Sequence, residues 1–467
     1  MKYISVKEAA KKFGINERRV RVLLKQKRIE GAIYKDHKYL IPENANKPLD
    51  RRIKGQRLFE DSPLNDLDFD FKNYRKKFPT DDGYFGRYGG SYIPNNLKKA
   101  MEEIYFGYQT IAKSSKFIAE LREIRKNYQG RPTPIYHCQN LSNYLGRVQI
   151  YLKREDLNHG GAHKLNNAMG QALLAKYLGK KKLIAETGAG SHGSAVAMAA
   201  AYFGLECDVY MGEVDMAKQA PNVARIKVLG ANVIPVSAGT KTLKEAVDAA
   251  FEAFAKEYKT AFYVMGSAVG PHPYPLMVRD FQEVIGREAK QQFLEMTGEL
   301  PDIVAACVGG GSNSIGMFED FLAEPVNIVG VEAMGTGKEP GKNSATMTLG
   351  KEMVLHGFNS LVLQNEDGTA GDAYSIASGL DYPGVGPEHA FLKEIGRVKY
   401  EYVTDDEAAE AFFLLSRLEG IIPAIESAHA VAYLEKLMPN TKEGEIVLVN
   451  ISGRGDKDGE RLVQYFE

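Results

Sequence analysis

The sequence has no tryptophan, few cysteines and no signal for secretion or membrane insertion. Its three cysteines, Cys138, Cys207 and Cys307, lie far apart and form no C-x-x-C pair. This indicates neither a disulfide framework nor a zinc site, and a reducing cytoplasm is expected. The longest uncharged run, counting histidine as neutral, is residues 187–205; it is rich in glycine, serine and histidine, so it predicts no membrane span. Early lysines and a glutamate interrupt any signal-peptide pattern.

The net charge is zero, but the charges are unevenly distributed. Residues 1–57 contain 17 basic against 6 acidic residues, a net charge of +11, so the remaining residues carry −11. A hydrophobic content of 44% with 26% charged residues is ordinary for a soluble globular protein, and 467 residues are enough for two or three domains. The sequence therefore predicts a small basic module joined to a larger acidic one.

The basic module begins with two short predicted helices. Ser5 and Glu8 form a capping box for a helix over residues 5–13, residues 14–16 read as a turn, and a second helix follows over 17–26. A β-hairpin is predicted from residues 29–34 and 39–42, with a polar turn at 35–38. The second helix is crowded with basic side chains: Arg18, Arg19, Arg21 and Lys25.

This order of elements resembles the excisionase and MerR-like winged helix-turn-helix family. The resemblance implies that the second helix enters the DNA major groove, where lysine and arginine neutralise phosphates. The alternative is a charged dimerisation or docking module that never touches nucleic acid. We expect this domain over residues 1–57, a linker over 58–80 without sustained periodicity, and a catalytic domain over 81–467.

The catalytic domain shows alternating strand and helix patterns. Long helical stretches are expected at residues 97–119, 164–178, 221–229 and 242–258. The strand candidates are residues 149–152, 183–185, 207–211, 232–236, 261–264, 303–306, 327–331 and 446–450. This alternation predicts a doubly wound α/β architecture, with ligands beyond the carboxyl ends of the strands.

Lys164 stands where a predicted strand and a glycine-rich turn lead into a helix. A lysine at a helix start feels the positive end of the helix dipole, which favours the neutral amine. A neutral amine is what a Schiff base with an aldehyde cofactor requires. A solvated lysine is the ordinary interpretation of any single lysine, so the hypothesis depends on its surroundings.

Two glycine-rich loops support the hypothesis. Residues 186–193 and 307–314 each follow an apolar strand and precede a small-residue helix. Such turns expose backbone N–H groups at a helix N-terminus, which makes them anion-binding sites. A lysine together with two anion cradles is a more specific pattern than any one loop.

With these motifs in place, residues 82–466 resemble the tryptophan synthase β-subunit family of fold-type II pyridoxal-phosphate enzymes. The matching stretches are residues 83–90, 130–134, 153–167, 186–193, 270–275, 278–282, 307–313, 379–389, 419–430 and 452–456. The resemblance implies two lobes of doubly wound sheet with the cofactor between them, and a mobile subdomain over about residues 179–266.

The resemblance also implies roles in binding pyridoxal 5′-phosphate. Lys164 would form the Schiff base and later transfer the proton at the substrate α-carbon. Ser452 would bond the pyridine nitrogen and leave it unprotonated, which favours replacement at the β-carbon over transamination. Glu426 would lie near the ring. The phosphate would be held by His163, Gly309, Gly310, Gly311, Ser312 and Asn313.

Substrate roles follow from the same resemblance. Glu186 would protonate the departing serine hydroxyl and then orient indole through its ring N–H. Asp381 would contact the serine hydroxyl side and help close the mobile subdomain. The α-carboxylate would bind to Thr187, Gly188, Ala189, Gly190, Ser191 and His192. The indole pocket candidates, for which plain core packing is the alternative, are Leu243, Val247, Met265, Ser267 and Tyr382.

A monovalent cation, Na⁺ or K⁺, at the carbonyls of Gly309, Tyr382 and Gly384 is implied as well. The residues around the site depart from the family pattern in several places. Ser191 stands where glutamine is usual and Leu165 where threonine is usual. Lys218 replaces an arginine that would pair with Asp381, and lysine cannot make the same bidentate fork. Residues 265–270 vary too, and together these departures predict an altered closed state or an altered substrate.

The leading hypothesis is β-replacement, L-serine plus indole to L-tryptophan and water, through an aminoacrylate intermediate. The lack of tryptophan in the chain is compatible with it. One alternative keeps the cofactor but uses another nucleophile, such as a thiol or a substituted indole, or deaminates serine. Another is a ligand-sensing transcriptional regulator, which the basic module motivates. The resemblance further implies a homodimer and an α-subunit partner at residues 83–94 and Lys244.

Overall fold

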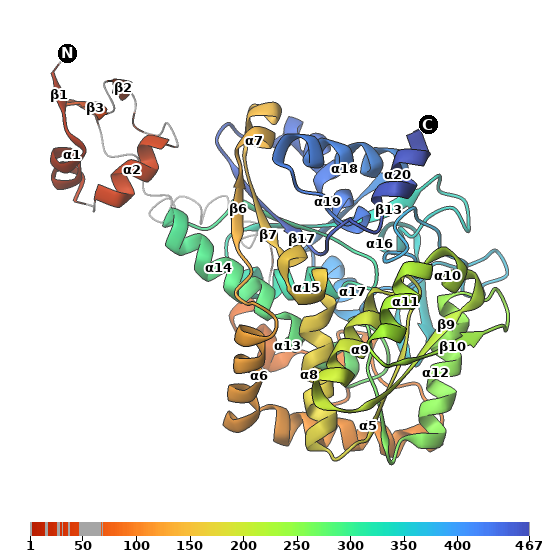
Figure 1. Cartoon of the computed structure of the whole chain (residues 1–467). Helices are drawn as coiled ribbons and strands as arrows, with labels where there is room; N and C mark the ends of the chain where they lie inside the picture. The colour runs from red at the N-terminus through yellow and green to blue at the C-terminus, as the bar shows by residue number, and fades with distance from the viewer. Residues whose placement is uncertain are drawn as a thin grey trace.

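The computed structural model describes residues 2–14, 17–25, 29, 31–35, 38–45, 67 and 69–466 (Figure 1). Parts of the predicted turn, second helix, hairpin and linker lie outside the described residues, at positions 15, 16, 26, 30, 36, 37, 58–66 and 68. The side chains of Arg19 and Lys25 lie outside them as well. No helix in the described ranges combines the length and apolarity needed to cross a membrane.

The N-terminal segment has the two predicted helices and the predicted hairpin, together with a short strand, β1, that was not predicted. The elements are β1 (Tyr3–Ile4), α1 (Val6–Phe13), α2 (Glu17–Lys25), β2 (Ile33–Lys35) and β3 (Lys38–Pro42). The capping box is confirmed, since the Glu8 N–H donates to Ser5 Oγ and the Ser5 N–H donates to Glu8 Oε2. The three strands form an antiparallel sheet in the order β1-β3-β2. Ala9, Phe13, Val20, Leu23 and Ile41 belong to a separate core beneath them.

The end of the predicted linker packs onto the catalytic domain. It contains η1 (Phe71–Asn73) and α4 (Tyr74–Lys77), and both Phe71 and Tyr74 are buried in the main core. Arg75 forms ion pairs with Asp280 and Glu283. Aromatic side chains without helical or strand periodicity therefore anchor this segment, and no pattern in the sequence predicted it.

The smaller lobe is built on a four-stranded parallel sheet. Its order is β10 (Asn232–Val236), β9 (Glu206–Gly212), β8 (Lys182–Glu186) and β11 (Ala261–Tyr263). Helices α9 (Ser191–Phe203) and α12 (Leu243–Glu257) both pack against β8 and β9. Since parallel crossovers are right-handed, the reversal of strand order after β10 puts α12 on the face opposite α9, with the sheet between them in Figure 1. Helices α10 (Glu213–Lys218) and α11 (Ala220–Val228) complete this lobe.

The larger lobe contains a six-stranded sheet. Its order is β16 (Lys399–Thr404), β13 (Asn327–Gly335), β12 (Ile303–Cys307), β17 (Ile446–Ile451), β7 (Gln149–Arg154) and β6 (Ile135–Cys138). All neighbouring strands are parallel except the edge strand β6, which is antiparallel to β7. Val304 and Ala306 face one core cluster, and Ile303 and Ala305 face the other. Both faces are buried, which explains the continuous apolar runs of these strands.

The remaining elements cover these sheets and add a small third one. The third sheet is antiparallel and contains β14 (Lys351–Leu355), β15 (Phe358–Val362), β5 (Tyr88–Gly89) and β4 (Tyr84–Phe85). The helices are α5 (Asn95–Gly107), α6 (Ser115–Asn127), α7 (Gln139–Leu145), α8 (Lys164–Tyr177), α13 (Tyr274–Gln282), α14 (Val284–Thr297), α15 (Ser312–Phe318), α16 (Thr346–Leu349), α17 (Pro387–Glu394), α18 (Asp405–Glu419), α19 (Ile425–Leu437) and α20 (Gly459–Phe466). Short turns are η2 (Tyr108–Ala112), η3 (Glu155–Leu157), η4 (His159–Gly161), η5 (Glu319–Phe321) and η6 (Met438–Asn440).

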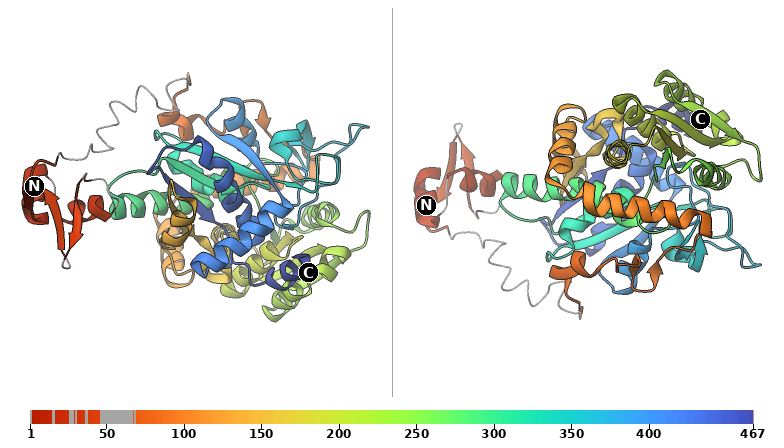
Figure 2. Two further views of the ribbon diagram at one scale, coloured as in Figure 1. Left: turned by 90° about the horizontal axis from the view of Figure 1, so that it is seen from above. Right: turned by 90° about the horizontal axis from the view of Figure 1, so that it is seen from below.

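All eight predicted strands are present. Seven of them agree with the prediction within two residues at each end, and β13 extends four residues beyond its predicted end. The helical stretch expected at residues 97–119 is divided, because α5 passes into the π-turn η2 and α6 starts anew after the N-cap Ser114. The orange helices α5 and α6 lie at the bottom of Figure 1 and come to the front in the view from below (Figure 2). The doubly wound α/β prediction is correct for the two large sheets, and it missed the antiparallel third sheet.

Candidate active site

Lys164 is the first residue of α8, after the turns that follow β7. Its Nζ donates to the carbonyl oxygen of Gly266 at 2.7 Å. Burial lowers the pKa of Lys164 to about 8, because removing water from the ammonium outweighs the attraction of Glu186 and Glu426. About one tenth of this amine is therefore neutral at pH 7, far more than in an exposed lysine, and the neutral form is the nucleophile toward an aldehyde.

The loop between β12 and α15 forms an anion cradle. In the described part of the chain, the backbone N–H groups of Gly309, Gly310 and Gly311 donate to no protein acceptor. They lie at the N-terminus of α15, where free N–H groups attract an anion. A Cβ on Gly310 would meet Ser267 Oγ at 2.5 Å, and one on Gly311 would meet His389 Cδ2 at 2.2 Å. Neither glycine therefore has room for a side chain, and both line a cavity together with Gly309.

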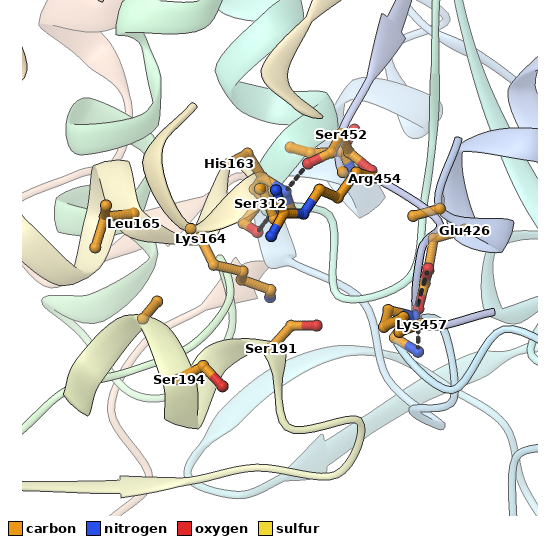
Figure 3. Close-up of a pocket in the computed structure, with 18 of the residues that line it drawn as sticks. His163, Lys164, Leu165, Ser191, Ser194, Ser312, Glu426, Ser452, Arg454 and Lys457 are labelled. Carbon is orange, nitrogen blue, oxygen red and sulfur yellow. Dashed lines mark hydrogen bonds and ion pairs between the residues drawn. The ribbon is translucent and has the colours of Figure 1, made fainter. Parts of the chain in front are cut away.

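His163 joins this loop to the C-terminal strand. Its Nδ1–H and its backbone N–H donate to the carbonyl oxygen of Ser452 at 3.1 and 2.9 Å. Its Nε2 accepts from the Ser312 hydroxyl at 3.0 Å. Burial, with the nearby Lys164 charge, lowers the pKa of His163 to about 3, so the ring is neutral. His163 therefore reaches the cradle through Ser312 (Figure 3).

Ser452 and Glu426 line the same cavity. Ser452 Oγ lies 2.9 Å from Ser427 Oγ and 3.8 Å from the thiol of Cys307. Glu426 accepts from the Gly379 N–H at 2.9 Å through Oε1, and its Oε2 lies 3.5 Å from the Lys457 ammonium without a hydrogen bond (Figure 3). Lys457 holds the pKa of Glu426 below its ordinary value despite burial.

Two adjoining cavities meet at Lys164. The first encloses about 970 Å³, part of it open to solvent, and is lined by every residue predicted to hold the cofactor, together with Leu165 and Ser191. The second encloses about 750 Å³ and shares Lys164, Ser191, Ser267, Gly310 and Gly379 with the first. A group held in the first cavity therefore lies directly beside a ligand in the second.

The loop after β8 forms a second anion cradle at the start of α9. The Thr187 hydroxyl accepts from the N–H groups of Gly190 and Gly193 at 3.1 and 3.3 Å, which fixes the turn. Within the described chain, the amides of Gly188, Ala189 and Ser191 have no protein acceptor. A small carboxylate fits these free donors.

His192 closes the same turn from inside. Its Nε2–H donates to the carbonyl oxygen of Val264 at 2.8 Å, and its buried Nδ1 has no hydrogen-bond partner. Burial and the Lys164 charge lower its pKa to about 3, so the ring is neutral.

Glu186 ends β8 and projects into the second cavity. It is 7% exposed, and its Oε2 has no hydrogen-bond partner. Burial raises the pKa of Glu186 to about 7, against the opposing effects of Tyr263 and Lys164. A carboxyl that is half protonated near neutral pH can both give and take a proton.

The second cavity is lined by all five residues predicted for the indole pocket. Leu243 and Val247 come from α12, Met265 and Ser267 from the segment after β11, and Tyr382 from the larger lobe. Sequence reasoning missed Phe251, Val269 and His356. Phe251 lies one helical turn beyond Val247, a spacing that could have revealed it, whereas His356 comes from a hairpin that was not predicted.

Asp381 lies beside the cavities rather than in their walls. Its neighbours Leu380 and Tyr382 line the first and the second cavity. Burial and the facing Asp215 raise the pKa of Asp381 to about 7, and burial raises that of Asp215 to about 6. The exposed Lys218 opposes both shifts by its charge but forms no ion pair with Asp381 among the described residues.

These features fit pyridoxal phosphate on the structure's own terms. The free amides of the first cradle can bind a phosphate, with the neutral His163 beside them. Lys164 can supply a neutral amine. In the same cavity, the buried Glu426 Oε2 has no hydrogen-bond partner. No cluster of three or more metal-binding His, Cys, Asp or Glu side chains exists among the residues described.

Comparisons with known proteins agree with this assignment. Residues 127–453 match the family model for "Pyridoxal-phosphate dependent enzyme". The chain is 63% identical over 397 residues to the "Tryptophan synthase beta chain" of Clostridium botulinum (strain Alaska E43 / Type E3), covering 85% of this chain and 98% of that protein. It is 61% identical over 395 residues to the "Tryptophan synthase beta chain 1" of Wolinella succinogenes, with the same two coverages.

Two solved structures share the fold. A fungal L-serine ammonia-lyase from Rhizomucor miehei has a TM-score of 0.55 at 19% identity and covers 72% of this chain and 98% of its own. A threonine deaminase from T.th. has a TM-score of 0.55 at 21% identity, covering 77% of this chain and 98% of its own. At this identity the likeness concerns the fold-type II architecture alone.

Proposed function

This chain belongs to the tryptophan synthase beta chains of the pyridoxal-phosphate dependent enzymes, and from that membership we propose that it joins L-serine and indole to give L-tryptophan and water. The observation that carries the proposal is Glu186. This buried carboxyl, with a pKa raised to about 7, faces an apolar cavity that adjoins Lys164. A plain serine deaminase would not need an apolar cavity of about 750 Å³ with a proton donor in its wall.

The residues of the first cavity would hold the cofactor. Gly309 to Asn313 would bind the phosphate through their amides, with His163 fixing Ser312, and the Ser452 hydroxyl would bond the pyridine nitrogen. When bound, pyridoxal phosphate supplies the aldehyde that takes up the amine and a conjugated ring that stabilises charge at the substrate α-carbon.

The chain's own groups then move the protons. The free amides of Gly188, Ala189 and Ser191 bind the serine carboxylate, and Lys164 Nζ takes the proton from the α-carbon. Glu186 gives its proton to the serine hydroxyl as that group leaves as water. Once ionised, Glu186 accepts a hydrogen bond from the indole N–H and turns the ring so that its C3 faces the β-carbon.

The apolar side chains around Glu186 exclude water from this step. Leu243, Val247, Phe251, Met265 and Val269 give the cavity wall its apolar character. Water in this space would compete with indole for the activated β-carbon. Asp381 is proposed to contact the serine hydroxyl side when residues 179–266 close over the site.

Spectroscopy on the full-length holoenzyme tests the proposal. L-serine should shift the visible band of the bound cofactor, and indole should then yield tryptophan. If serine shifts the band but indole is ignored, the acceptor is wrong, and Ser191, Leu165 and Lys218 become the basis of the alternative nucleophile or of deamination. If no band forms with added cofactor, the enzymatic proposal fails.

The N-terminal module is proposed to bind DNA. The support is a folded helix pair and hairpin, with exposed Arg18 and Arg21 on α2 and a net charge of +11 over residues 1–57. Reversing both charges (Arg18→Glu with Arg21→Glu) should abolish a gel shift of the gene's upstream DNA and leave tryptophan synthesis unchanged. Absence of any salt-sensitive shift by the unaltered protein would favour the docking module, and a shift that responds to serine would favour the regulator.

The proposal also covers the domain boundaries, the protein partners, a monovalent cation and the cellular location. We divide the chain at residues 57 and 80, with the last part of the linker, from residue 69, packed onto the catalytic domain. A homodimer, an α-subunit partner at residues 83–94 and Lys244, and a monovalent cation at the carbonyls of Gly309, Tyr382 and Gly384 are carried over from the family resemblance. A cytoplasmic location is supported by three free, buried thiols.

A further inference from the structure

Tyr263, the last residue of β11, lies on the same face of the smaller sheet as Glu186. Tyr263 pairs with Ile184 of the parallel strand β8, and the Val264 N–H donates to the Ile184 carbonyl oxygen at 2.8 Å. Side chains two residues apart on a strand point to the same face, so Glu186 shares its face with Ile184 and with Tyr263. Such diagonal neighbours on adjacent strands are within reach of a long aromatic side chain.

The Tyr263 side chain packs under helix α12, which also covers the second cavity. Its ring is stacked on that of Phe251 with the centroids 4.4 Å apart, and it lies 5.8 Å from the ring of Phe254. Phe251 and Glu186 line the second cavity together. Tyr263 is fully buried, and a phenylalanine in its place would keep these aromatic contacts. The packing therefore does not explain the hydroxyl.

The hydroxyl of Tyr263 and Oε2 of Glu186 are both buried, and neither has a hydrogen-bond partner among the described residues. An unpaired donor and an unpaired acceptor in a dry site are each unfavourable, and a hydrogen bond between the two groups removes both penalties. Burial raises the pKa of Glu186 to about 7, and the Tyr263 hydroxyl is the group that opposes this rise most. The sheet geometry and the electrostatics therefore indicate the same pair.

The titratable side chains that surround Glu186 are Lys164, His192, Tyr263, Tyr274, His356 and Tyr382. Lys164, His192 and Tyr274 each donate to a backbone carbonyl oxygen, and His356 and Tyr382 share a hydrogen bond. The other ring nitrogen of His192 is unpartnered as well, but it carries no proton, so it has none to give to a carboxylate. Of these side chains, Tyr263 alone has no partner in the part of the chain that the structure describes.

We propose that the Tyr263 hydroxyl donates a hydrogen bond to Glu186 once that carboxyl has given its proton to the serine hydroxyl, and so assists the proton transfer. The inference rests on the proposed function for the identity of the proton acceptor, and it deepens that function by assigning Tyr263 as a positioning residue that acts through Glu186. A hydrogen bond to an ionised carboxylate is about twice as strong as one to a neutral group, so the stabilisation grows as the proton leaves. Tyr263 then holds one carboxylate oxygen and leaves the other for the indole N–H.

The direct test measures the ionisation of Glu186 in the full-length protein without serine or indole. Infrared difference spectra between acid and alkaline pH report the loss of the carboxyl C=O stretch. The band is assigned by its absence from Glu186→Gln, because Asp381 and Glu332 titrate in the same range. The midpoint should lie near pH 7 in the unaltered protein and about one pH unit higher in Tyr263→Phe, which has lost the donor to the ionised form. The control Tyr151→Phe removes the hydroxyl of a buried tyrosine on β7 and should leave the midpoint unchanged.

Steady-state kinetics test whether Tyr263 acts through Glu186. Tyr263→Phe should lower the rate of tryptophan formation from serine by about tenfold, because the departing hydroxyl needs the proton. From β-chloro-L-alanine the rate should fall by less than about twofold, because chloride leaves without a proton. Added to Glu186→Gln, Tyr263→Phe should lower the rate with serine no further, since the carboxyl through which it acts is gone.

The two measurements separate this inference from the proposed function. An unchanged or lowered midpoint in Tyr263→Phe overturns the inference, whatever the rates are. Equal losses with serine and with β-chloro-L-alanine overturn it too, because the tyrosine would then serve packing alone, and they leave tryptophan synthesis standing. A raised midpoint in a protein that ignores indole supports the inference and shows that only the proposed acceptor was wrong.

Discussion

The Nζ atom of Lys164 lies 2.7 Å from the carbonyl oxygen of Gly266, 102 residues further along the chain. This hydrogen bond holds the amine at the boundary between the two cavities, where a cofactor and an acceptor would meet. It also links the start of α8 to the segment that follows β11. The contact sets the direction of the amine, and burial lowers its pKa and so increases its reactivity.

Attachment of pyridoxal phosphate to the apoprotein should accelerate as the pH rises and level off above about 8. The pKa of Lys164 is lowered to about 8, and only the neutral amine attacks an aldehyde. Stopped-flow absorbance measures the rate. A midpoint near the ordinary lysine value of 10.5 would contradict the burial argument. Lys164→Ala should show no attachment, and Lys176→Ala, on the exposed face of the same helix, should behave as the unaltered protein.

Glu186→Gln should lower tryptophan formation by about 10²- to 10⁴-fold, the usual contribution of a general acid. Glutamine keeps the size of the side chain but has no proton to give to a departing hydroxyl. With β-chloro-L-alanine the loss should be much smaller, because chloride leaves without a proton. Equal losses with both amino acids would indicate that Glu186 acts by packing alone.

The reaction with serine should also decline as the pH rises through about 7. Burial raises the pKa of Glu186, so the acidic form that the first step needs is lost in that range. The Glu186→Gln variant should lack this limb of the pH profile. A limb that persists in the variant would belong to another group, such as Asp381, whose pKa is also raised to about 7.

Gly311→Ala should destabilise the protein by about 3 kcal/mol and weaken cofactor binding at least about tenfold. A left-handed φ of +93° strains the new side chain, and its Cβ would meet His389. The matched control is Gly146→Ala, which has φ +76° and open space around the Cβ. That control should cost about 1 kcal/mol from strain alone and leave cofactor binding unchanged. Thermal unfolding and cofactor titration measure the two effects.

Lys218→Arg should lower the KM for serine about two- to tenfold. Arginine can make a bidentate pair with Asp381 when residues 179–266 close, which lysine cannot. Steady-state kinetics checks the value, and Lys227→Arg, on α11, serves as a control for the same exchange. An unchanged KM would mean that Asp381 finds another partner in the closed state.

The sequence by itself determined the local elements and the identity of the chemical groups. Strand and helix positions follow from hydrophobic periodicity, and the anion cradles follow from glycines between a strand and a helix. Lys164 at a helix start and the capping box at Ser5 and Glu8 are local patterns as well. Such features depend on neighbouring residues, so one chain suffices to predict them.

Only the tertiary structure decided which distant groups meet and what their burial does. His163 contacts Ser452 across 289 residues, and the aromatic residues around Tyr74 anchor a segment that has no periodicity of its own. The raised pKa of Glu186 and the lowered pKa of His163 come from loss of water and from neighbours on other elements. Desolvation and long-range contacts depend on the packed molecule, and no local pattern of residues encodes them.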